Sequence, residues 1–390
     1  MLRHSGCFHL MTSMIFVVLF FAIGTSGCGN QSGTTTDSAE AEENDPNYRV
    51  PNGSPAKILA FVNELEQRRP QFSHPNEQFD HMVKTQKAII RAGNKILAQP
   101  SDDKTLKEIV SKKLMGTILL ATGDGAASEK ALAEVERLRN DKRPIVAEVA
   151  NEYLVVARSL MLNSMSTAER TQLADEAIRR TQEANFTNEK ISDVQFVATQ
   201  FLNAGDSDSA ASLYERLADA LLESKAERKT KAYATQFRGQ SNRIRLPGSK
   251  LELDGKLLSG DDFDWESYRG KVVLVDFWAT WCGPCVADMP NIQATYNKFH
   301  KKGFDVVAVS LDNDRKALES FVRQRSLPWV QIVDNTPRTK QGRQETLSNR
   351  YNISSIPTAF LVDRDGKVVS TFARGEELQR LLNQLLETTE

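Results

Sequence analysis

Two different patterns of apolar and polar residues divide the chain. From about Pro55 to Gly239, apolar residues recur at helical spacing, as at Ile58, Val62 and Leu65. We expect about eight or nine helices here, with consecutive helices packed antiparallel. From Leu251 onward, short continuous apolar runs alternate with helical stretches. The pattern therefore predicts an all-α domain over residues 53–240, followed by an α/β domain over residues 246–390 with a central mixed sheet flanked by helices.

Individual elements of the α/β domain can be placed from the apolar runs and the turn residues between them. Asp254-Gly255 and Arg364-Asp-Gly366 are typical of tight turns between paired strands. The run 271–279 is apolar enough for a strand buried on both faces. The expected order is a hairpin within 251–265, strand 271–279, helix to 299, strand 304–311, helix 315–325, strand 329–333, strand 356–362, strand 367–372 and a final helix from Glu376.

The N-terminal segment has the pattern of an export signal. Arg3 precedes the apolar run 14–23, which is short for a membrane span but suits a signal peptide, predicted here over residues 1–27. A membrane anchor is the alternative. The small residues before Cys28 resemble a bacterial lipoprotein signal, in which the cysteine is acylated, although Thr25 stands where that family usually has Leu. Ordinary cleavage therefore remains an alternative to lipidation of Cys28.

The stretch after Cys28 is polar and acidic up to Asn47, with almost no large apolar residue. Such a composition cannot form a core, so residues 28–52 are predicted to be a disordered acidic tether. Signal, lipid and tether together predict an exported protein, anchored by lipid on the periplasmic or extracytoplasmic side of a bacterial membrane.

Cysteine use indicates redox chemistry rather than a structural framework. The chain has 390 residues, a formal net charge of −1, which gives no bias toward nucleic acid, and four cysteines. Cys7 and Cys28 lie in the N-terminal segment, so Cys282 and Cys285 alone remain for the folded part. A bridge across so short a loop stabilises a fold little. The alternative, half of a zinc site, lacks a second cysteine pair or a nearby histidine, so neither a metal nor another cofactor is expected.

The position of this pair suits a reactive thiol. Cys282 stands where a strand ends and a helix begins, and a helix N-terminus stabilises a thiolate. We therefore expect Cys282 to be the exposed nucleophile and Cys285, one turn further on, to be buried and to resolve the mixed disulfide. Gly283 and Pro284 between them favour a tight turn, and proline is tolerated in the first turn of a helix.

Several motifs in residues 246–390 resemble the thioredoxin-like TlpA/ResA group of membrane-tethered thiol–disulfide oxidoreductases. They are Trp278-Ala-Thr-Trp-Cys-Gly-Pro-Cys285, Met289-Pro290, Ile356-Pro-Thr358 and Asp363-Arg-Asp-Gly366, and the expected strand and helix order is that of thioredoxin. The resemblance implies a redox disulfide Cys282–Cys285 with Trp281 as a supporting residue. It also implies a cis bond between Ile356 and Pro357 that faces the dithiol and leaves backbone free for a bound peptide; an ordinary trans edge proline is the alternative.

Two acids are candidates for proton transfer. Asp276 lies within the apolar strand, where burial would raise its pKa, and Asp288 follows Cys285 by three residues. At the position of Asp276, thioredoxin has an aspartate, whereas the TlpA/ResA group often has Asn. At the position of Asp288, that group commonly has Glu. No lysine is placed on the second strand to pair with Asp276, which departs from thioredoxin. Asp288 has the alternative interpretation of a solvated acid in the first turn of a helix.

The predicted function is disulfide exchange with exported thiol or disulfide proteins, in the direction of reduction because Gly-Pro between the cysteines is the thioredoxin pairing. A membrane electron donor would then recharge the dithiol. One alternative is a thiol peroxidase related to peroxiredoxins, although Phe277-Trp278-Ala279 replaces that family's pattern. Another is a scaffold in which the helical domain, a bundle or a tetratricopeptide-like solenoid, binds a protein partner and the redox pair only regulates it.

Overall fold

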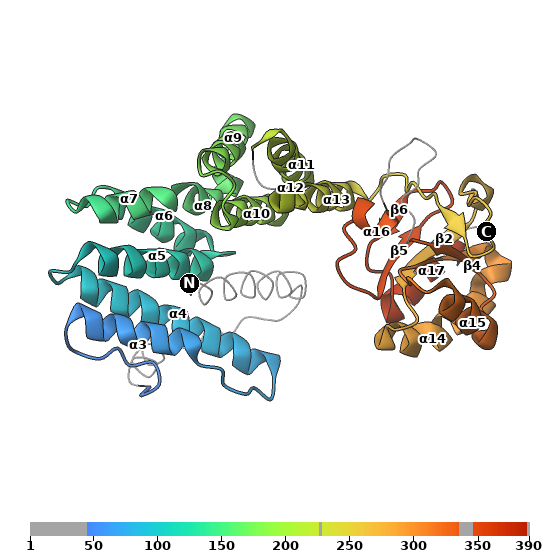
Figure 1. Ribbon diagram of the computed structural model, residues 1–390, viewed down its shortest axis with the longest axis horizontal. Helices are drawn as coiled ribbons and strands as arrows, with labels where there is room; N and C mark the ends of the chain where they lie inside the picture. Colours follow the sequence, from blue (N-terminus) through green and yellow to red (C-terminus); the bar gives the residue numbers. More distant parts are fainter. Residues whose placement is uncertain (1–44, 226–227, 335–345, 388–390) are drawn as a thin grey trace. The chain divides into compact units, whose positions relative to one another are not determined.

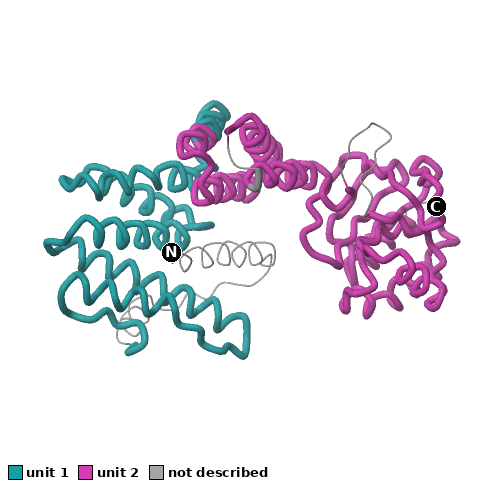
Figure 2. The backbone as a smooth tube through the Cα atoms, in the orientation of Figure 1, with its two compact units in different colours: residues 1–176 teal, residues 177–390 magenta. Residues whose placement is uncertain are grey.

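The computed structural model describes residues 45–225, 228–334 and 346–387, which form two compact units, one ending at Glu176 and the other spanning Ala177–Glu390 (Figure 2). The signal peptide predicted over residues 1–27 and the lipidation site Cys28 lie outside the described residues. Within the described ranges, no helix combines the length and the apolar character needed to cross a bilayer. The all-α and α/β boundary predicted at residues 240–246 stays a prediction.

Side-chain caps fix the starts of three helices of the first unit, α3, α5 and α6. Ser54, Asp102 and Asp124 each accept a hydrogen bond from a backbone N–H in the first helical turn, which satisfies a donor that the helix leaves unpaired. The described residues between Pro55 and Gly239 contain more helices than the eight or nine expected, in part because the polypeptide breaks at Tyr153 between α7 and α8. The elements are α3 (Pro55–Gln67), α4 (Pro75–Leu97), α5 (Asp103–Ala121), α6 (Gly125–Arg139), α7 (Pro144–Glu152), α8 (Leu154–Ser159), the 3₁₀ turn η1 (Leu162–Ser164) and α9 (Thr167–Glu183), which runs into the second unit (Figure 1).

The last part of the predicted tether is packed against these helices. Val50 is buried, and its carbonyl accepts a hydrogen bond of 3.1 Å from Lys95 of α4. The hydroxyl of Tyr48 bonds to His81 of the same helix. Residues 45–52 are therefore ordered, because the Val50 carbonyl and the Tyr48 hydroxyl find partners on α4.

The second unit begins with four helices and continues into a six-stranded sheet. The strand order is β1-β4-β3-β2-β5-β6, with β2, β3 and β4 parallel and the other pairings antiparallel. The elements are α10 (Asn188–Asn203), α11 (Ser207–Glu223), α12 (Arg228–Lys231), α13 (Tyr233–Arg245), β1 (Lys256–Leu257), η2 (Glu266–Tyr268), β2 (Val272–Trp278), α14 (Gly283–Phe299), η3 (His300–Lys302), β3 (Phe304–Ser310), α15 (Arg315–Arg325), β4 (Val330–Val333), α16 (Leu347–Arg350), β5 (Thr358–Val362), β6 (Val368–Ser370) and α17 (Gly375–Glu387). This is the mixed sheet flanked by helices that the sequence predicts.

Side-chain alternation along β2 separates two cores. Leu274 and Trp278 join the core under α14, α15 and α17, which also contains both cysteines. Val275 and Phe277 join the core on the opposite face, where residues 246–265 and α16 cover the sheet. Every residue of β2 is buried, as expected of a central strand. The position of a β2 residue in the sequence therefore decides whether its side chain reaches the disulfide side of the sheet.

The hairpin expected around Asp254-Gly255 has its turn elsewhere. The N–H of Leu257 bonds to the carbonyl of Asp261 at 2.9 Å, so the chain reverses four residues later than predicted. The carboxylate of Asp254 forms an ion pair with the buried guanidinium of Arg350, at 3.0 Å. Gly255, with φ 140°, lies so close to β4 that an added Cβ would come within 2.9 Å of Ile332. Gly255 is needed for this close approach rather than for a turn.

Helix α13 packs directly on α16 within this unit. Asn242 donates to the carbonyl of Arg350 at 3.0 Å, and Arg243 donates to that of Asn352 at 3.2 Å. Where the helices touch, an added Cβ on Gly239 would come within 2.2 Å of the carbonyl oxygen of Asn349. The last helix before the sheet is thus a packed part of the α/β fold.

Candidate redox site

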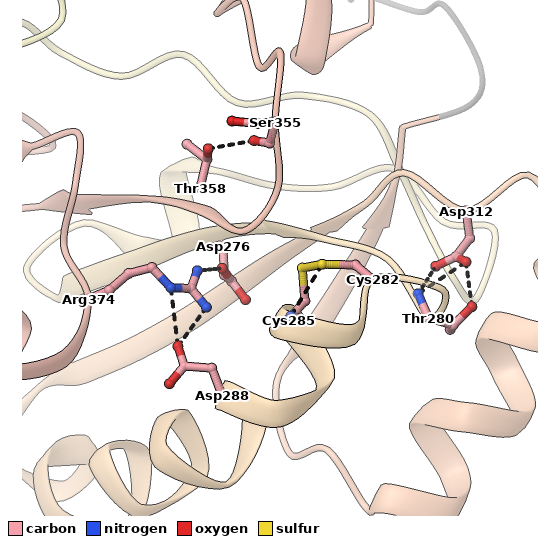
Figure 3. The surroundings of a disulfide bond; sticks show 9 residues. All are labelled: Asp276, Thr280, Cys282, Cys285, Asp288, Asp312, Ser355, Thr358 and Arg374. Carbon is pink, nitrogen blue, oxygen red and sulfur yellow. Dashed lines mark hydrogen bonds and ion pairs between the residues drawn. A yellow bond between two sulfur atoms is a disulfide. The ribbon is translucent and has the colours of Figure 1, made fainter. Parts of the chain in front are cut away.

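The two cysteines form a disulfide at the N-terminus of α14, directly after the loop that follows β2 (Figure 3). Cys282 is the N-cap residue of the helix, and its sulfur accepts a hydrogen bond of 3.2 Å from the N–H of Cys285. This donor and the positive end of the helix dipole would stabilise a thiolate on Cys282. Cys282 is 5% exposed and Cys285 1%, so both are buried in the oxidised form; the predicted burial of Cys285 is seen, and the predicted exposure of Cys282 is not.

The residues around the cysteines leave room for a partner. Trp281 is 67% exposed, which makes it a large apolar surface next to Cys282. An added Cβ on Gly283 would meet no atom within 4 Å, so the fold itself does not require glycine there. Pro284 lies in the first turn of α14, as predicted. This combination suits the approach of another polypeptide to the disulfide.

The loop before Cys282 is held by a residue that the sequence analysis missed. Asp312, 3% exposed, accepts hydrogen bonds from the N–H of Thr280 at 3.0 Å and from its hydroxyl at 2.6 Å. It also accepts one from the hydroxyl of Ser310 at 2.8 Å. Because Ser310 of β3 pairs with Trp278 of parallel β2, the two strands end side by side. A polar residue just beyond the end of β3 was the available signal for this contact.

The peptide bond between Ile356 and Pro357 is cis, which confirms that prediction. Ile356 packs against the core that contains both cysteines. Thr358 opens β5, and its hydroxyl donates to the carbonyl of Ser355 at 2.7 Å (Figure 3).

Asp276 lies on the disulfide side of the sheet. Alternate residues of a strand face the same side, so Asp276 faces the same side as Leu274 and Trp278, whose side chains belong to the core that contains both cysteines. Asp276 is only 3% exposed. Its neighbours on β3 and β5 are Ala308 and Ala359, which offer it no hydrogen bond from a side chain. The sequence correctly indicates a buried carboxyl on this face.

The partner of Asp276 is Arg374, which the sequence analysis did not identify. Nη1 of Arg374 lies 2.7 Å from Oδ1 of Asp276, and Nη2 lies 2.6 Å from Oδ2 of Asp288 (Figure 3). One guanidinium therefore joins both candidate acids. The cation comes from the residue before α17 rather than from the second strand, and a lone arginine at the start of the last helix was its only signal.

Burial dominates the proton affinity of Asp276. It raises the pKa of that carboxyl to about 6, against the opposing effect of Arg374 and with a smaller contribution in the same direction from Asp288. A group with this pKa exchanges protons near neutral pH, which suits an acid–base role.

This raised pKa predicts how stability depends on pH. Folded Asp276 binds its proton more tightly than unfolded Asp276, so folding stability falls as pH rises from about 4 to about 6 and is flat above. An Asp276→Asn variant keeps an acceptor for Arg374 but cannot ionise. We expect it to equal the parent near pH 4 and to be more stable by up to ~3 kcal/mol at pH 7. Urea unfolding at both pH values measures this. A difference in the free energy of unfolding between the two proteins that is the same at both pH values would contradict it.

A cavity of about 430 Å³ opens between α14 and α17 beside these charges. Arg374 and Asp288 form part of its polar lining, while Leu274, Ala359 and Ala373 form part of its apolar lining. Neither cysteine nor Asp276 lines it, so of the candidate site residues the cavity reaches Asp288 alone. Among the described residues, no three His, Cys, Asp or Glu side chains are grouped so that they could hold a metal ion.

Comparison with known proteins agrees with this geometry. The Redoxin family matches residues 245–385. Thiol-disulfide oxidoreductase ResA of Bacillus thuringiensis subsp. konkukian is 32% identical over 130 residues, which are 33% of this chain and 70% of that protein. The chain belongs to the ResA family of thiol–disulfide oxidoreductases.

A second ResA protein and a solved structure match a similar extent of the chain. ResA of Geobacillus kaustophilus is 30% identical over 131 residues, 33% of this chain and 71% of that protein. A solved thioredoxin domain of a thiol-disulfide oxidoreductase from Bacteroides vulgatus is 30% identical, with a TM-score of 0.32, and covers 36% of this chain and 97% of that one. The two ResA relatives match a third of the chain, and this C-terminal part is an oxidoreductase carrying the Cys282–Cys285 pair.

Proposed function

We propose that this protein is a membrane-tethered thiol–disulfide oxidoreductase that reduces disulfides in exported proteins. The observation that carries the proposal is the position of Cys282 as the N-cap of α14, with its sulfur accepting the N–H of Cys285. A sulfur held in this way is the better leaving group and the better thiolate of the pair.

The reaction follows from the placement of the two sulfurs. In the reduced protein, the Cys282 thiolate attacks a substrate disulfide, and one substrate sulfur leaves as a thiolate. Cys285 then loses its proton to a nearby carboxylate, for which Asp276 is the candidate, and attacks the sulfur of Cys282. The second substrate thiolate leaves and the Cys282–Cys285 disulfide forms. Two electrons have passed to the substrate, and an external dithiol must return them for the next cycle.

The recognition of protein substrates is supported by the surroundings of the disulfide. Trp281 offers an exposed aromatic surface, and Gly283 leaves space above the first turn of the helix. The family resemblance implies that the segment at Ile356–Pro357 leaves backbone free to pair with an extended peptide. The reducing direction and the export and tethering are proposed from Gly283-Pro284 and from the N-terminal sequence.

Trapping tests the proposal directly. A full-length Cys285→Ala variant should accumulate exported proteins in mixed disulfides with Cys282, because the resolving thiol is missing. The adducts are isolated from cells that export the protein, released with dithiothreitol and identified by mass spectrometry. A Cys282→Ala, Cys285→Ala double variant is the control and should capture none. Absence of adducts sensitive to dithiothreitol would overturn the proposal.

A further inference from the structure

Three charged groups from three separate elements meet on the disulfide side of the sheet. Asp276 comes from β2, Asp288 from the first turns of α14, and Arg374 from the residue before α17. Nε and Nη2 of Arg374 both donate to Oδ2 of Asp288, at 3.1 and 2.6 Å, while Nη1 donates to Oδ1 of Asp276 at 2.7 Å. All three nitrogens of the guanidinium are thus engaged by the two acids, which fixes its plane.

We infer that Arg374 is a positioning residue for the proposed proton acceptor, Asp276, because one guanidinium binds Asp276 and Asp288 at the same time. The inference rests on the proposed function and adds a residue to it. Arginine does not release its own proton, so Arg374 cannot be the base. Its contact occupies Oδ1 of Asp276 and leaves Oδ2 of that carboxylate to accept the proton of Cys285.

The surroundings of Asp276 explain why such a cation is needed. Asp276 is 3% exposed, and two buried neighbours, Ala308 and Ala359, cannot solvate a charge. The charged groups that act on it are Arg374 and Asp288, and the two cysteines belong to the core on the same side of the sheet. Without Arg374 the two carboxylates would repel each other, and the buried one would hold its proton at neutral pH.

Asp288 holds the guanidinium in place. Its second oxygen accepts a hydrogen bond of 2.9 Å from Asn291, so the acid is fixed to its own helix as well as to Arg374. The other charged residues beside the cavity, Lys298 and Glu376, line it together with Arg374. Asp288 therefore orients Arg374 rather than acting on Cys285 itself, which separates the roles of the two acids.

The test is the pH dependence of the resolving step. In the full-length protein, the rate at which a preformed mixed disulfide on Cys282 is resolved should rise with pH around the pKa of Asp276, about 6. In Arg374→Met we expect the midpoint to move up by ~1 pH unit or more, because an opposite charge at hydrogen-bonding distance is lost. In Arg374→Lys, which keeps the positive charge, the midpoint should lie close to that of the parent. Arg380→Met is the matched control, since Arg380 pairs with Glu377 on the surface of α17, and it should leave the midpoint unchanged.

A spectroscopic readout distinguishes positioning from a structural role. The carboxyl ¹³C shift of Asp276, followed against pH, should show the same upward shift in Arg374→Met and its return in Arg374→Lys. An unchanged midpoint in Arg374→Met, with or without a loss of stability, would overturn the inference. If Arg374→Met does not fold, Asp288→Asn decides, because it removes the residue that holds Arg374 in place. A midpoint of Asp288→Asn equal to that of the parent would overturn the inference. Failure of the parent to reduce disulfides at any pH would instead overturn the proposed function.

Discussion

Replacing Cys282 by serine is expected to abolish disulfide exchange, down to the rate measured without the protein. Serine cannot form the mixed disulfide, and Cys285, 1% exposed and inside the helix, is poorly placed to replace it. A Cys285→Ser variant should still react once with a substrate disulfide, because Cys282 is unchanged, but should not release the product. Reduction of a protein disulfide with dithiothreitol as the regenerating dithiol measures both rates.

Alkylation provides the independent check on these assignments. In the reduced parent protein, rapid labelling followed by mass mapping should modify Cys282 before Cys285, because the Cys285 N–H and the helix N-terminus favour the Cys282 thiolate. Faster labelling of Cys285 would reverse the roles of the two cysteines.

Replacing Asp312 by alanine should have the largest effect on stability, roughly 3 kcal/mol, with a fall in exchange rate. The N–H and hydroxyl of Thr280 and the hydroxyl of Ser310 would all lose their acceptor in a buried place. The loop that carries Trp281 to Cys282 would then be less well fixed, so the cysteine would spend less time at the helix N-terminus. Urea unfolding and exchange rates on the full-length protein measure the two effects.

Asp314→Ala is the matched control for Asp312. Asp314 is the N-cap of α15 and accepts from Lys316 and Ala317, so its loss should cost about 1 kcal/mol and leave exchange unchanged. Thr280→Val removes one of the three hydrogen bonds to Asp312, so its loss of stability should lie between those of Asp312→Ala and Asp314→Ala. Equal stability of Asp312→Ala and Asp314→Ala would contradict the role given to Asp312.

The parts of the site that the sequence predicts are those set by local pattern. The apolar run of β2, the helix start at Cys282 and the helix α15 depend on neighbouring residues, and the structure places them as expected. The cis bond at Pro357 came from a family motif and is confirmed. Asp276 was correctly placed in a buried strand, and its catalytic role, like that of Asp288, stays a prediction.

The missed residues depend on contacts between distant segments. Arg374 is separated from Asp276 by 98 positions, and its place before the last helix does not by itself indicate which acid it meets. Asp312 could have been anticipated, because parallel β2 and β3 must end at the same edge of the sheet. The prediction of a turn at Asp254-Gly255 was wrong because both residues contact residues far along the chain. Asp254 forms an ion pair with Arg350, and Gly255 packs closely against Ile332.

The packing of α13 has a consequence for how this protein could have been assembled in evolution. The similarity to the Redoxin family begins at residue 245, where α13 ends, yet α13 supplies hydrogen bonds to the carbonyls of Arg350 and Asn352 inside the shared domain. The point in the sequence where the family similarity begins is therefore not a boundary between separately packed parts of the structure. A recombination that moved the oxidoreductase to another helical partner would have to carry this helix with it, or find a new donor for each of those two carbonyls.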